Sequence, residues 1–223
     1  MRRELRPILA LLLAAVALCL IFRQWPQIDL AATQYFYDSG AHRFDPFLHL
    51  LGLVCKRGIY IFNDVWIPLL IAGNLIFFLN RARTQWLGLN RAQWAFLIAV
   101  MALGPGLSVA VAKQYFHRPR PVEIVQFGGT QPYVPPFARG TAHGESFFSG
   151  HAATGFYFCA FALLERRHRR RRYAFGLLLG GIIGLSRIIM GAHFVSDILF
   201  SGLFMLLVMY LLLATIFRNR LNP

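Results

Sequence analysis

Long apolar runs alternate with short polar segments along the whole chain. Six runs stand out, at residues 7–22, 58–79, 93–112, 150–164, 173–189 and 196–217. A helix crosses the hydrocarbon core of a bilayer with about 20 residues, within a range of about 17–25. The runs 58–79, 93–112 and 196–217 have this length, and the other three reach it if their ends extend into the flanking residues. The pattern therefore predicts an all-α, polytopic membrane protein with a bundle of six transmembrane helices.

Two longer polar segments interrupt this pattern. Residues 23–57 combine aromatic and charged side chains, so we expect part of this segment to lie on the membrane surface as an amphipathic helix. Residues 122–148 are rich in glycine and proline, with one Gly-Gly and one Pro-Pro pair. Such a composition predicts an irregular loop.

Composition supports the membrane class. The 223 residues are 57% hydrophobic and 14% charged, and the mean hydropathy is +0.52. The net charge of +14 would also suit a nucleic-acid-binding protein. However, the basic residues gather between apolar runs, where membrane proteins carry their topology signals. We therefore expect no nucleic-acid partner, and the three widely separated cysteines predict neither a disulfide framework nor a thiolate metal site.

The basic residues also predict the orientation of the chain. Most of the 23 Lys and Arg residues precede the first run, follow the sixth, or lie between the second and third and the fourth and fifth runs. Because positively charged loops stay inside, we expect both termini in the cytoplasm and a multi-pass protein of the plasma (inner) membrane. No A-x-A site follows the first run, so we expect an uncleaved helix. Residues 1–223 are expected to form a single integral-membrane domain.

Three polar clusters lie at those ends of the apolar runs that this topology places on the extracytoplasmic face. Ionisable groups beside membrane segments are costly and commonly mark function. The clusters are Lys113, Arg120 and Pro121; Ser149, Gly150 and His151; and Arg187, His193 and Asp197.

The second cluster stands where a loop meets an apolar helix. Ser149 is a good N-cap and Gly150 allows close approach to the backbone, so this helix start is a ready anion site. His151 is placed to give a proton to a departing oxygen. The alternative is a plain helix cap followed by an interfacial histidine.

The third cluster has the spacing of an oriented histidine. His193 and Asp197 are four residues apart, which makes them neighbours on one helix face. A carboxylate bound to one imidazole nitrogen fixes the tautomer, and the other nitrogen can then attack phosphorus and form a phosphohistidine. The alternatives are a satisfied His–Asp pair at a helix end, and Arg187 snorkelling to the interface.

The first cluster supplies positive charge. Arg120 can bind two phosphate oxygens with its planar guanidinium, and Lys113 adds a point charge. With Arg187 they provide three fixed cations in place of Mg²⁺, so we expect no metal and no other cofactor. The alternative is a juxtamembrane basic patch that contacts anionic lipid headgroups.

The order and spacing of these clusters, K-x6-RP, SGH and SR-x5-H-x3-D, resembles the type 2 phosphatidic acid phosphatase (PAP2) superfamily. The motifs lie within residues 113–197, and Phe148 replaces the proline that usually precedes SGH, which changes the loop entry but removes no functional group. The resemblance implies that His193 is the nucleophile, oriented by Asp197, and that His151 protonates the leaving group. It assigns phosphate binding to Lys113, Arg120, Ser149, Gly150 and Arg187.

The resemblance also implies a class of substrate. Bacterial membrane relatives dephosphorylate lipid A, undecaprenyl pyrophosphate or phosphatidylglycerophosphate, so we expect hydrolysis of a lipid phosphate monoester or pyrophosphate at the extracytoplasmic face. The short chain, with its stretch from Ser146 to His151, most resembles the lipid A phosphatases, so we expect lipid A first and the other two lipids next. The partner would be a phospholipid or glycolipid in the membrane, with no obligate protein partner. Four residues near the outer loop are expected to contact the headgroup: Arg118, Arg139, His143 and Glu145.

Two rival functions remain open from the sequence. One is a zinc hydrolase built from His143, Glu145, His151 and His193, although no HExxH spacing is present. The other is a lipid or ion transporter or scramblase, in which charged residues line a pathway. A transporter would place ionisable groups near the bilayer centre, whereas here they cluster at one end of the runs.

Overall fold

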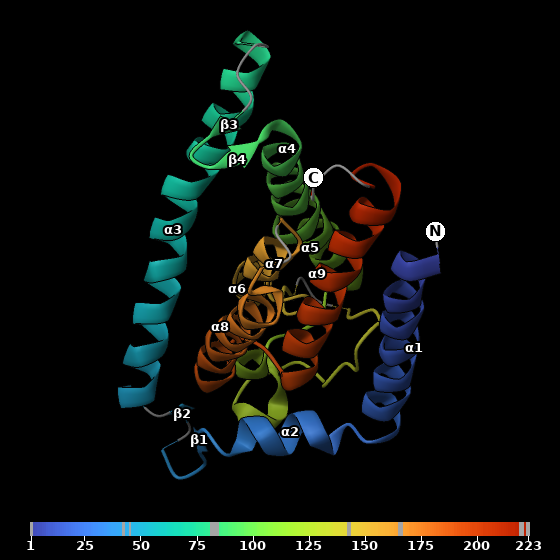
Figure 1. The fold of residues 1–223 in the computed structure, drawn as a ribbon. Helices are drawn as coiled ribbons and strands as arrows, with labels where there is room; N and C mark the ends of the chain where they lie inside the picture. The colour runs from blue at the N-terminus through green and yellow to red at the C-terminus, as the bar shows by residue number, and fades with distance from the viewer. Residues whose placement is uncertain are drawn as a thin grey trace.

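The fold is a bundle of helices (Figure 1). This computed structural model describes residues 2–41, 43–44, 46–80, 85–141, 144–164, 167–218 and 221. Five helical segments in the described ranges are long and apolar enough to cross a membrane: Leu5–Gln24, His49–Leu79, Arg91–Glu123, Arg169–Ile189 and Val195–Thr215. Gly150–Leu164 is a shorter apolar helix at the place of the remaining predicted span. The chain is therefore a helical, multi-pass membrane protein.

The elements follow one another as helices with short connections. The α-helices are α1 (Arg2–Gln24), α2 (Gln27–Gln34), α3 (Pro46–Leu79), α4 (Arg91–Met101), α5 (Val109–Phe116), α6 (Gly150–Tyr157), α7 (Phe161–Leu164), α8 (Arg169–Ile189) and α9 (Val195–Thr215). A π-helix, η1 (Ala102–Ser108), and three 3-10 turns, η2 (Pro121–Glu123), η3 (Val125–Phe127) and η4 (Phe158–Ala160), join them. Two antiparallel ribbons pair β1 (Tyr37–Asp38) with β2 (Arg43–Phe44), and β3 (Gln85–Trp86) with β4 (Leu89–Asn90).

The polar segment after the first helix is more helical than its hydropathy predicts. Only α2 is a surface-type helix there, and α3 already begins at Pro46, twelve residues before the predicted apolar run at 58. Lys56 and Arg57 immediately precede the predicted apolar run, but both are good helix formers, so the helix continues through them. The structure therefore contains a short helix within the segment predicted to carry a surface helix, and the predicted start of the second long helix is wrong.

The third apolar run contains the π-helix at its centre. Pro105 lacks a backbone N–H and cannot continue the regular α-helical ladder. The chain widens into η1 around it and returns to α-helix in α5, which carries Lys113 in its last turn. His117 then ends α5 in the left-handed conformation, with φ 47°, and turns the chain into the polar loop. This exit places the Arg118–Arg120 segment over the end of the bundle.

Small residues bring α6 and α8 into close contact. A Cβ at Gly155 would lie 2.7 Å from the Cα of Gly180, and at Gly184 a Cβ would collide with Ile198 of α9. Close backbone approach through small residues is typical of helices that pack within membranes. The packing fixes the relative positions of α6, which begins at Gly150, and α8, which carries Arg187.

Figure 1 shows how the functional segments gather at one end of the bundle. The helix α2 lies across this end, where α8 finishes and α9 starts, and both chain termini lie toward the opposite end. Between Phe127 and Gly150 the described residues form an irregular loop, as predicted. The loop carries the residues that complete the site.

Candidate active site

His193 occupies the turn between α8 and α9 rather than a helix face. The helix α9 begins at Val195, so the predicted helical spacing of His193 and Asp197 is replaced by a turn that leads into the first helical turn. The two side chains still meet, with Nδ1 of His193 3.7 Å from Oδ2 of Asp197. A closer acceptor is the backbone carbonyl of Ser146, 2.6 Å from the same Nδ1.

These partners determine the tautomer of the imidazole. Both the Ser146 carbonyl and the Asp197 carboxylate accept hydrogen bonds, so Nδ1 carries the hydrogen and Nε2 keeps its lone pair. Burial lowers the pKa of His193 below its ordinary value of 6.5, although the hydrogen bond and charge of Asp197 act to raise it. The neutral ring therefore offers Nε2 as a nucleophile.

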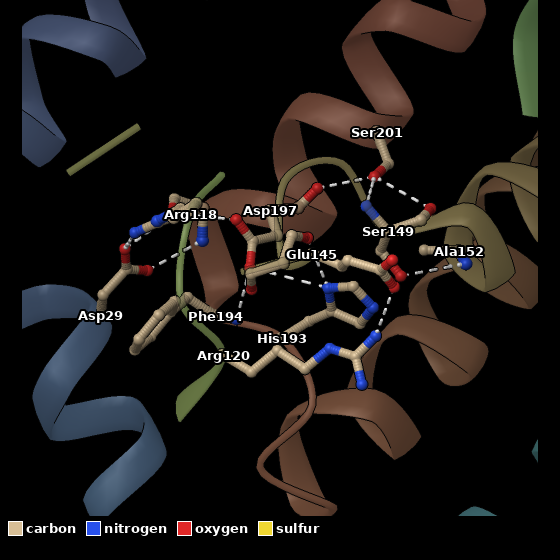
Figure 2. Close-up of polar contacts among 12 residues, drawn as sticks. Asp29, Arg118, Arg120, Glu145, Ser149, Ala152, His193, Phe194, Asp197 and Ser201 are labelled. Atoms are coloured by element: carbon tan, nitrogen blue, oxygen red, sulfur yellow. Dashed lines mark hydrogen bonds and ion pairs between the residues drawn. The ribbon is translucent and has the colours of Figure 1, made fainter. Parts of the chain in front are cut away.

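Asp197 is held on every side by donors. Its Oδ2 accepts the hydroxyl of Ser146 at 2.5 Å and the backbone N–H of Phe194 at 2.8 Å, and its Oδ1 forms an ion pair with Arg118. Ser146 thus contacts both members of the pair, with its carbonyl on His193 and its hydroxyl on Asp197. Figure 2 shows the carboxylate between the imidazole and the Arg118 guanidinium.

Arg118 does not contact the solvent where a headgroup would bind, so the headgroup role predicted for it is wrong. The residue is 1% exposed. Its guanidinium is occupied by protein groups, namely the carboxylates of Asp29 and Asp197, the hydroxyls of Ser196 and Tyr133, and the carbonyl of Val134. The loop explains its inward direction, since Ser146 N donates to the Arg118 carbonyl at 2.9 Å and fixes this part of the backbone.

Arg120, two residues further on, does face the site. Its Nη2 lies 3.1 Å from Oε2 of Glu145, and its own backbone N–H donates to Glu123 at 2.7 Å. Figure 2 shows the Arg120 guanidinium beside the His193 ring. Of the two arginines in this stretch, Arg120 is therefore the one that can meet a phosphate.

The start of α6 has the predicted geometry. Ser149 is the N-cap, and its hydroxyl accepts the N–H of Ala152 at 3.4 Å, which confirms the capping role. Ser201 of α9 fixes this turn, because its hydroxyl accepts the Ser149 N–H at 3.0 Å and donates to the Asp197 carbonyl at 2.6 Å. The helix start is thereby attached to the first turn of α9, which carries Asp197.

Several predicted site residues carry buried polar atoms that have no hydrogen-bond partner among the described residues. Among the residues that the structure describes, five buried side-chain polar atoms have no hydrogen-bond partner: Tyr37 Oη, Asn63 Oδ1, Arg120 Nε, His151 Nε2 and Arg187 Nε. Three of the five belong to predicted site residues. A buried donor without a partner costs about 1–3 kcal/mol, and more when it is charged. The Nε–H groups of Arg120 and Arg187 are therefore donors that a phosphate ligand can use.

An apolar cavity leads away from these groups between α3, α5 and α6. It has a volume of about 550 Å³, and Lys113, Gly150 and His151 line one part of it. The rest of the lining is mostly apolar and comes from α3, α4 and η1, including Ile59, Leu70 and Met101. Such a cavity can receive the hydrocarbon part of a lipid while its phosphate reaches the polar groups.

The other predicted headgroup residues have different surroundings. Arg139 is exposed and lies over the ring of Tyr115, 5.7 Å from its centroid. Glu145 is occupied by Arg120 in this structure. His143 lies outside the described residues. Across the ranges that are described, no group of three His, Cys, Asp or Glu side chains is arranged to hold a metal ion.

The fold and the site define a membrane phosphoryl-transfer enzyme, and the comparison with protein families agrees. The family model of the PAP2 superfamily matches residues 93–221, more than half of the chain. The chain belongs to the PAP2 superfamily.

Known relatives cover most of the chain. A lipid A 4'-phosphatase of Francisella tularensis subsp. novicida is 32% identical over 210 residues, covering 90% of this chain and 91% of the relative. A lipid A 4'-phosphatase of Rhizobium leguminosarum is 26% identical over 89% of this chain and 91% of its own. A lipid A 1-phosphatase of Rhizobium etli is 35% identical, but over 55% of this chain and 49% of the relative.

A solved structure has the same fold. The transmembrane PAP2-type phosphatidylglycerolphosphate phosphatase from Bacillus subtilis superposes with a TM-score of 0.60 at 20% identity. The match covers 93% of this chain and 94% of that protein. The similarity therefore extends beyond the motifs to nearly the whole helical bundle.

Proposed function

We propose that this protein is a lipid A phosphatase that works through a phosphohistidine on His193 at the extracytoplasmic face of the inner membrane. One observation carries the chemistry. The Nδ1 side of His193 is occupied by acceptors, while Arg120, His151 and Arg187 present unpaired buried nitrogens among the described residues. A nucleophilic nitrogen beside arginine N–H groups that have no protein partner suits a phosphoryl group.

The reaction follows in two displacements. Nε2 of His193 attacks phosphorus, the P–N bond forms as the P–O bond to the lipid breaks, and His151 gives its proton to the departing oxygen. Water then attacks the phosphohistidine, His151 takes a proton from it, and inorganic phosphate leaves with His193 restored. Lys113, Arg120 and Arg187, with the Ser149–Gly150 helix start, stabilise the charge on the phosphoryl oxygens.

The positive charge that develops on His193 is balanced from behind. Asp197 lies 3.7 Å from Nδ1 and is itself held by Ser146, so the carboxylate needs no rearrangement during the reaction. This pre-organisation stabilises the phosphoimidazolium without a metal. The proposed enzyme therefore requires no cofactor.

The proposed topology has six spans in a single domain, residues 1–223, with both termini in the cytoplasm. The Gly150–Leu164 segment would be the fourth span, packed between α8, α9 and η1 rather than against lipid alone. Two features support this orientation: the arginine-rich connection before α8 and the positions of the termini opposite the site (Figure 1). The positive-inside rule then places the site outside the cytoplasm.

The proposed substrate is the 4'-phosphate of lipid A. The two relatives described above that match about nine-tenths of the chain act at this position, whereas the 1-phosphatase matches little more than half. Exposed Arg139 and the Arg120–Glu145 pair at the mouth of the site would contact the sugar headgroup. The apolar cavity beside His151 would receive an acyl chain.

The test is phosphate release by the purified protein in EDTA, against lipid A, undecaprenyl pyrophosphate, phosphatidylglycerophosphate and phosphatidic acid. We expect the highest kcat/KM with lipid A, and mass spectrometry of the product should show loss of the 4'-phosphate. His168→Asn is the control, because His168 precedes α8 at the other end of the bundle and should retain full activity. Preference for another lipid would overturn the assigned substrate, and loss of activity in EDTA would overturn the metal-free mechanism.

A further inference from the structure

A closed polar cluster lies behind the Asp197 carboxylate, on the side away from the His193 ring. Its charged members are Asp29 of α2, Arg118 of the loop after α5, and Asp197 of α9. Asp29 and Asp197 are fully buried and Arg118 is 1% exposed. Asp29 and Asp197 are 168 positions apart in the sequence, and Figure 2 shows them on either side of the same guanidinium.

The Arg118 guanidinium bridges the two carboxylates. Its Nη2 lies 2.8 Å from Oδ2 of Asp29, and its Nη1 pairs with Oδ1 of Asp197. Nε donates to the Val134 carbonyl at 2.7 Å, and the group lies over the Phe194 ring, 4.6 Å from its centroid. A planar group held along its edge and on its face has one orientation, so it also fixes the carboxylate that it contacts.

Asp29 in turn holds the first turn of α9. Its Oδ1 accepts the backbone N–H of Ser196 at 2.8 Å, and its Oδ2 accepts the hydroxyls of Ser196 and Tyr133 at 2.5 and 2.9 Å. Ser196 is the residue next to Asp197. Asp29 thus acts on the catalytic carboxylate by two routes, through Arg118 and through the backbone beside it.

The charges of the cluster reach His193. A guanidinium paired with Asp197 alone would offset the charge that stabilises a phosphoimidazolium. Asp29 contributes a second negative charge, so the three groups together remain negative behind the ring. The low dielectric of a buried site makes this difference larger than it would be in water.

We propose that Asp29 and Arg118 are positioning residues that hold Asp197 in place and set the charge that His193 experiences. The proposal rests on the proposed role of His193 as the nucleophile. It also gives α2 a function, because this short helix across the end of the bundle delivers Asp29 to the active site.

Other groups facing His193 come from every element around it, and all of them are retained in the variants below. These groups are Asp197 from α9, Arg187 from α8, Lys113 from α5, His151 from α6, and Arg120 and Glu145 from the loop. A change in the pH profile on substitution of Asp29 or Arg118 therefore reports the charge of the cluster.

The experiment compares Asp29→Asn, Arg118→Gln and the double variant with the wild type. Asp29→Asn removes a negative charge near His193, so the acid limb of the kcat/KM profile should move to lower pH. Arg118→Gln removes a positive charge, so the limb should move to higher pH, and the double variant should return toward the wild type. For both single variants we expect kcat to fall about 10- to 100-fold with little change in KM.

The control is Asp38→Asn. Asp38 is exposed in β1 and accepts only turn N–H groups of Gly40 and Ala41 among the contacts described, which asparagine can also do. It should leave kcat and the acid limb unchanged. The proposal would be overturned if both single variants lose kcat only in proportion to their loss of thermal stability and the acid limb does not move. The cluster would then have a structural role only.

A second variant keeps the test decisive if a charge substitution prevents folding. Ser196→Ala removes the hydroxyl that joins Asp29 and Arg118 but leaves both charges. It should lower kcat severalfold, with an unchanged KM and acid limb, even where the folded protein remains fully populated at the assay temperature. An unchanged kcat would overturn the positioning role.

Binding of orthovanadate, measured by titration calorimetry across pH, separates this proposal from the assigned substrate. Vanadate forms a bond with a phosphoryl-accepting nucleophile and needs no lipid. Opposite shifts of the acid limb of vanadate binding in Asp29→Asn and Arg118→Gln would support the cluster even if no lipid tested is hydrolysed. If the wild type hydrolyses lipid A but the acid limb of vanadate binding does not move in either variant, the role of the cluster would be overturned and the proposed function would stand.

Discussion

The two sides of the His193 ring differ in how completely their polar groups are paired. Behind the ring, both carboxylate oxygens of Asp197 have donors, and the Arg118 guanidinium is bound along its length. In front of it, nitrogens of Arg120, His151 and Arg187 are buried without partners in the described part of the chain. The two sides also differ in burial, since Asp197 and Arg118 are buried, whereas the side chain of Arg120 is 36% exposed.

This difference distinguishes the groups that hold the nucleophile in place from the groups that can bind the substrate. A fully paired polar network has one arrangement and keeps it. Unpaired buried donors are costly unless a ligand completes them, and that cost is recovered when a phosphoryl group arrives. The protein therefore keeps the orientation of its nucleophile independent of the substrate, while the donors in front remain available.

The largest effect is expected at the boundary between the two sides. His193→Ala removes the proposed nucleophile, and phosphate release should fall at least about 10⁴-fold, as for other nucleophiles that act within a unit. The variant should still insert and melt like the wild type, which thermal unfolding in detergent can check. Substantial residual activity would contradict the assignment of His193.

The next effect concerns the front of the site. His151→Ala should lower kcat for lipid A by about 10²–10⁴-fold, the usual contribution of a general acid. An aryl phosphate with an acidic leaving group needs little protonation of that group. With this substrate, the rate of phosphohistidine formation in His151→Ala should therefore fall much less. Equal losses on both substrates in single-turnover measurements would indicate that His151 is not the proton donor.

Changing the shape of an arginine in front of the ring is expected to reduce kcat/KM measurably, but less than the two histidine substitutions reduce activity. Arg187→Lys keeps the charge and loses the planar fork, so kcat/KM should fall about tenfold or more. Arg171→Lys, at an exposed position in the first turn of α8, is the matched substitution and should change kcat/KM less than threefold. Similar effects at the two positions would remove the distinction between a phosphate ligand and a surface arginine.

The packing of α6 against α8 supports the site, and it can be weakened without changing a polar group. Gly155→Ala introduces a Cβ that would lie 2.7 Å from Gly180 Cα, and the resulting strain should cost about 1–3 kcal/mol of unfolding free energy. Gly181→Ala is the control, because its Cβ meets no atom within 4 Å. If Gly181→Ala is as destabilising as Gly155→Ala, the close α6–α8 contact does not hold the site together.

The smallest expected effect is a displacement of the acid limb in the pH profile of the wild type. Burial lowers the pKa of His193, and the nucleophile must be neutral. The acid limb of kcat/KM should therefore lie below pH 6.5, and activity should persist into mildly acidic solution. A limb above this value would mean that Asp197 dominates over burial.

Sequence patterns predicted Asp197 and the candidate residues in front of His193, but not the groups that hold Asp197 from behind. Lys113, His151 and Arg187 follow from motif spacing and from the cost of charge near a membrane. Arg118 and Arg120 are both arginines before a proline, and hydropathy cannot tell which of them points inward. The structure settles this difference through the left-handed turn at His117 and the contact of the loop with the Arg118 carbonyl.

Asp29 could not be predicted for a different reason. It lies in a segment whose pattern predicts a surface helix, and its partner Arg118 is 89 residues away. Ser146 acts through its backbone carbonyl and its hydroxyl, and Ser201 acts through its hydroxyl. Such contacts leave no periodic signal. Contacts of this kind depend on tertiary packing, so only the folded chain reveals them.

The stereochemical course at phosphorus tests the central claim most directly. Each in-line displacement inverts the configuration, so two displacements through His193 give overall retention, whereas direct attack by water gives inversion. A lipid A thiophosphate made chiral with oxygen isotopes, hydrolysed by the wild-type protein, should yield thiophosphate with retained configuration. Inversion would contradict a phosphohistidine intermediate, however strongly the His193→Ala substitution reduces activity.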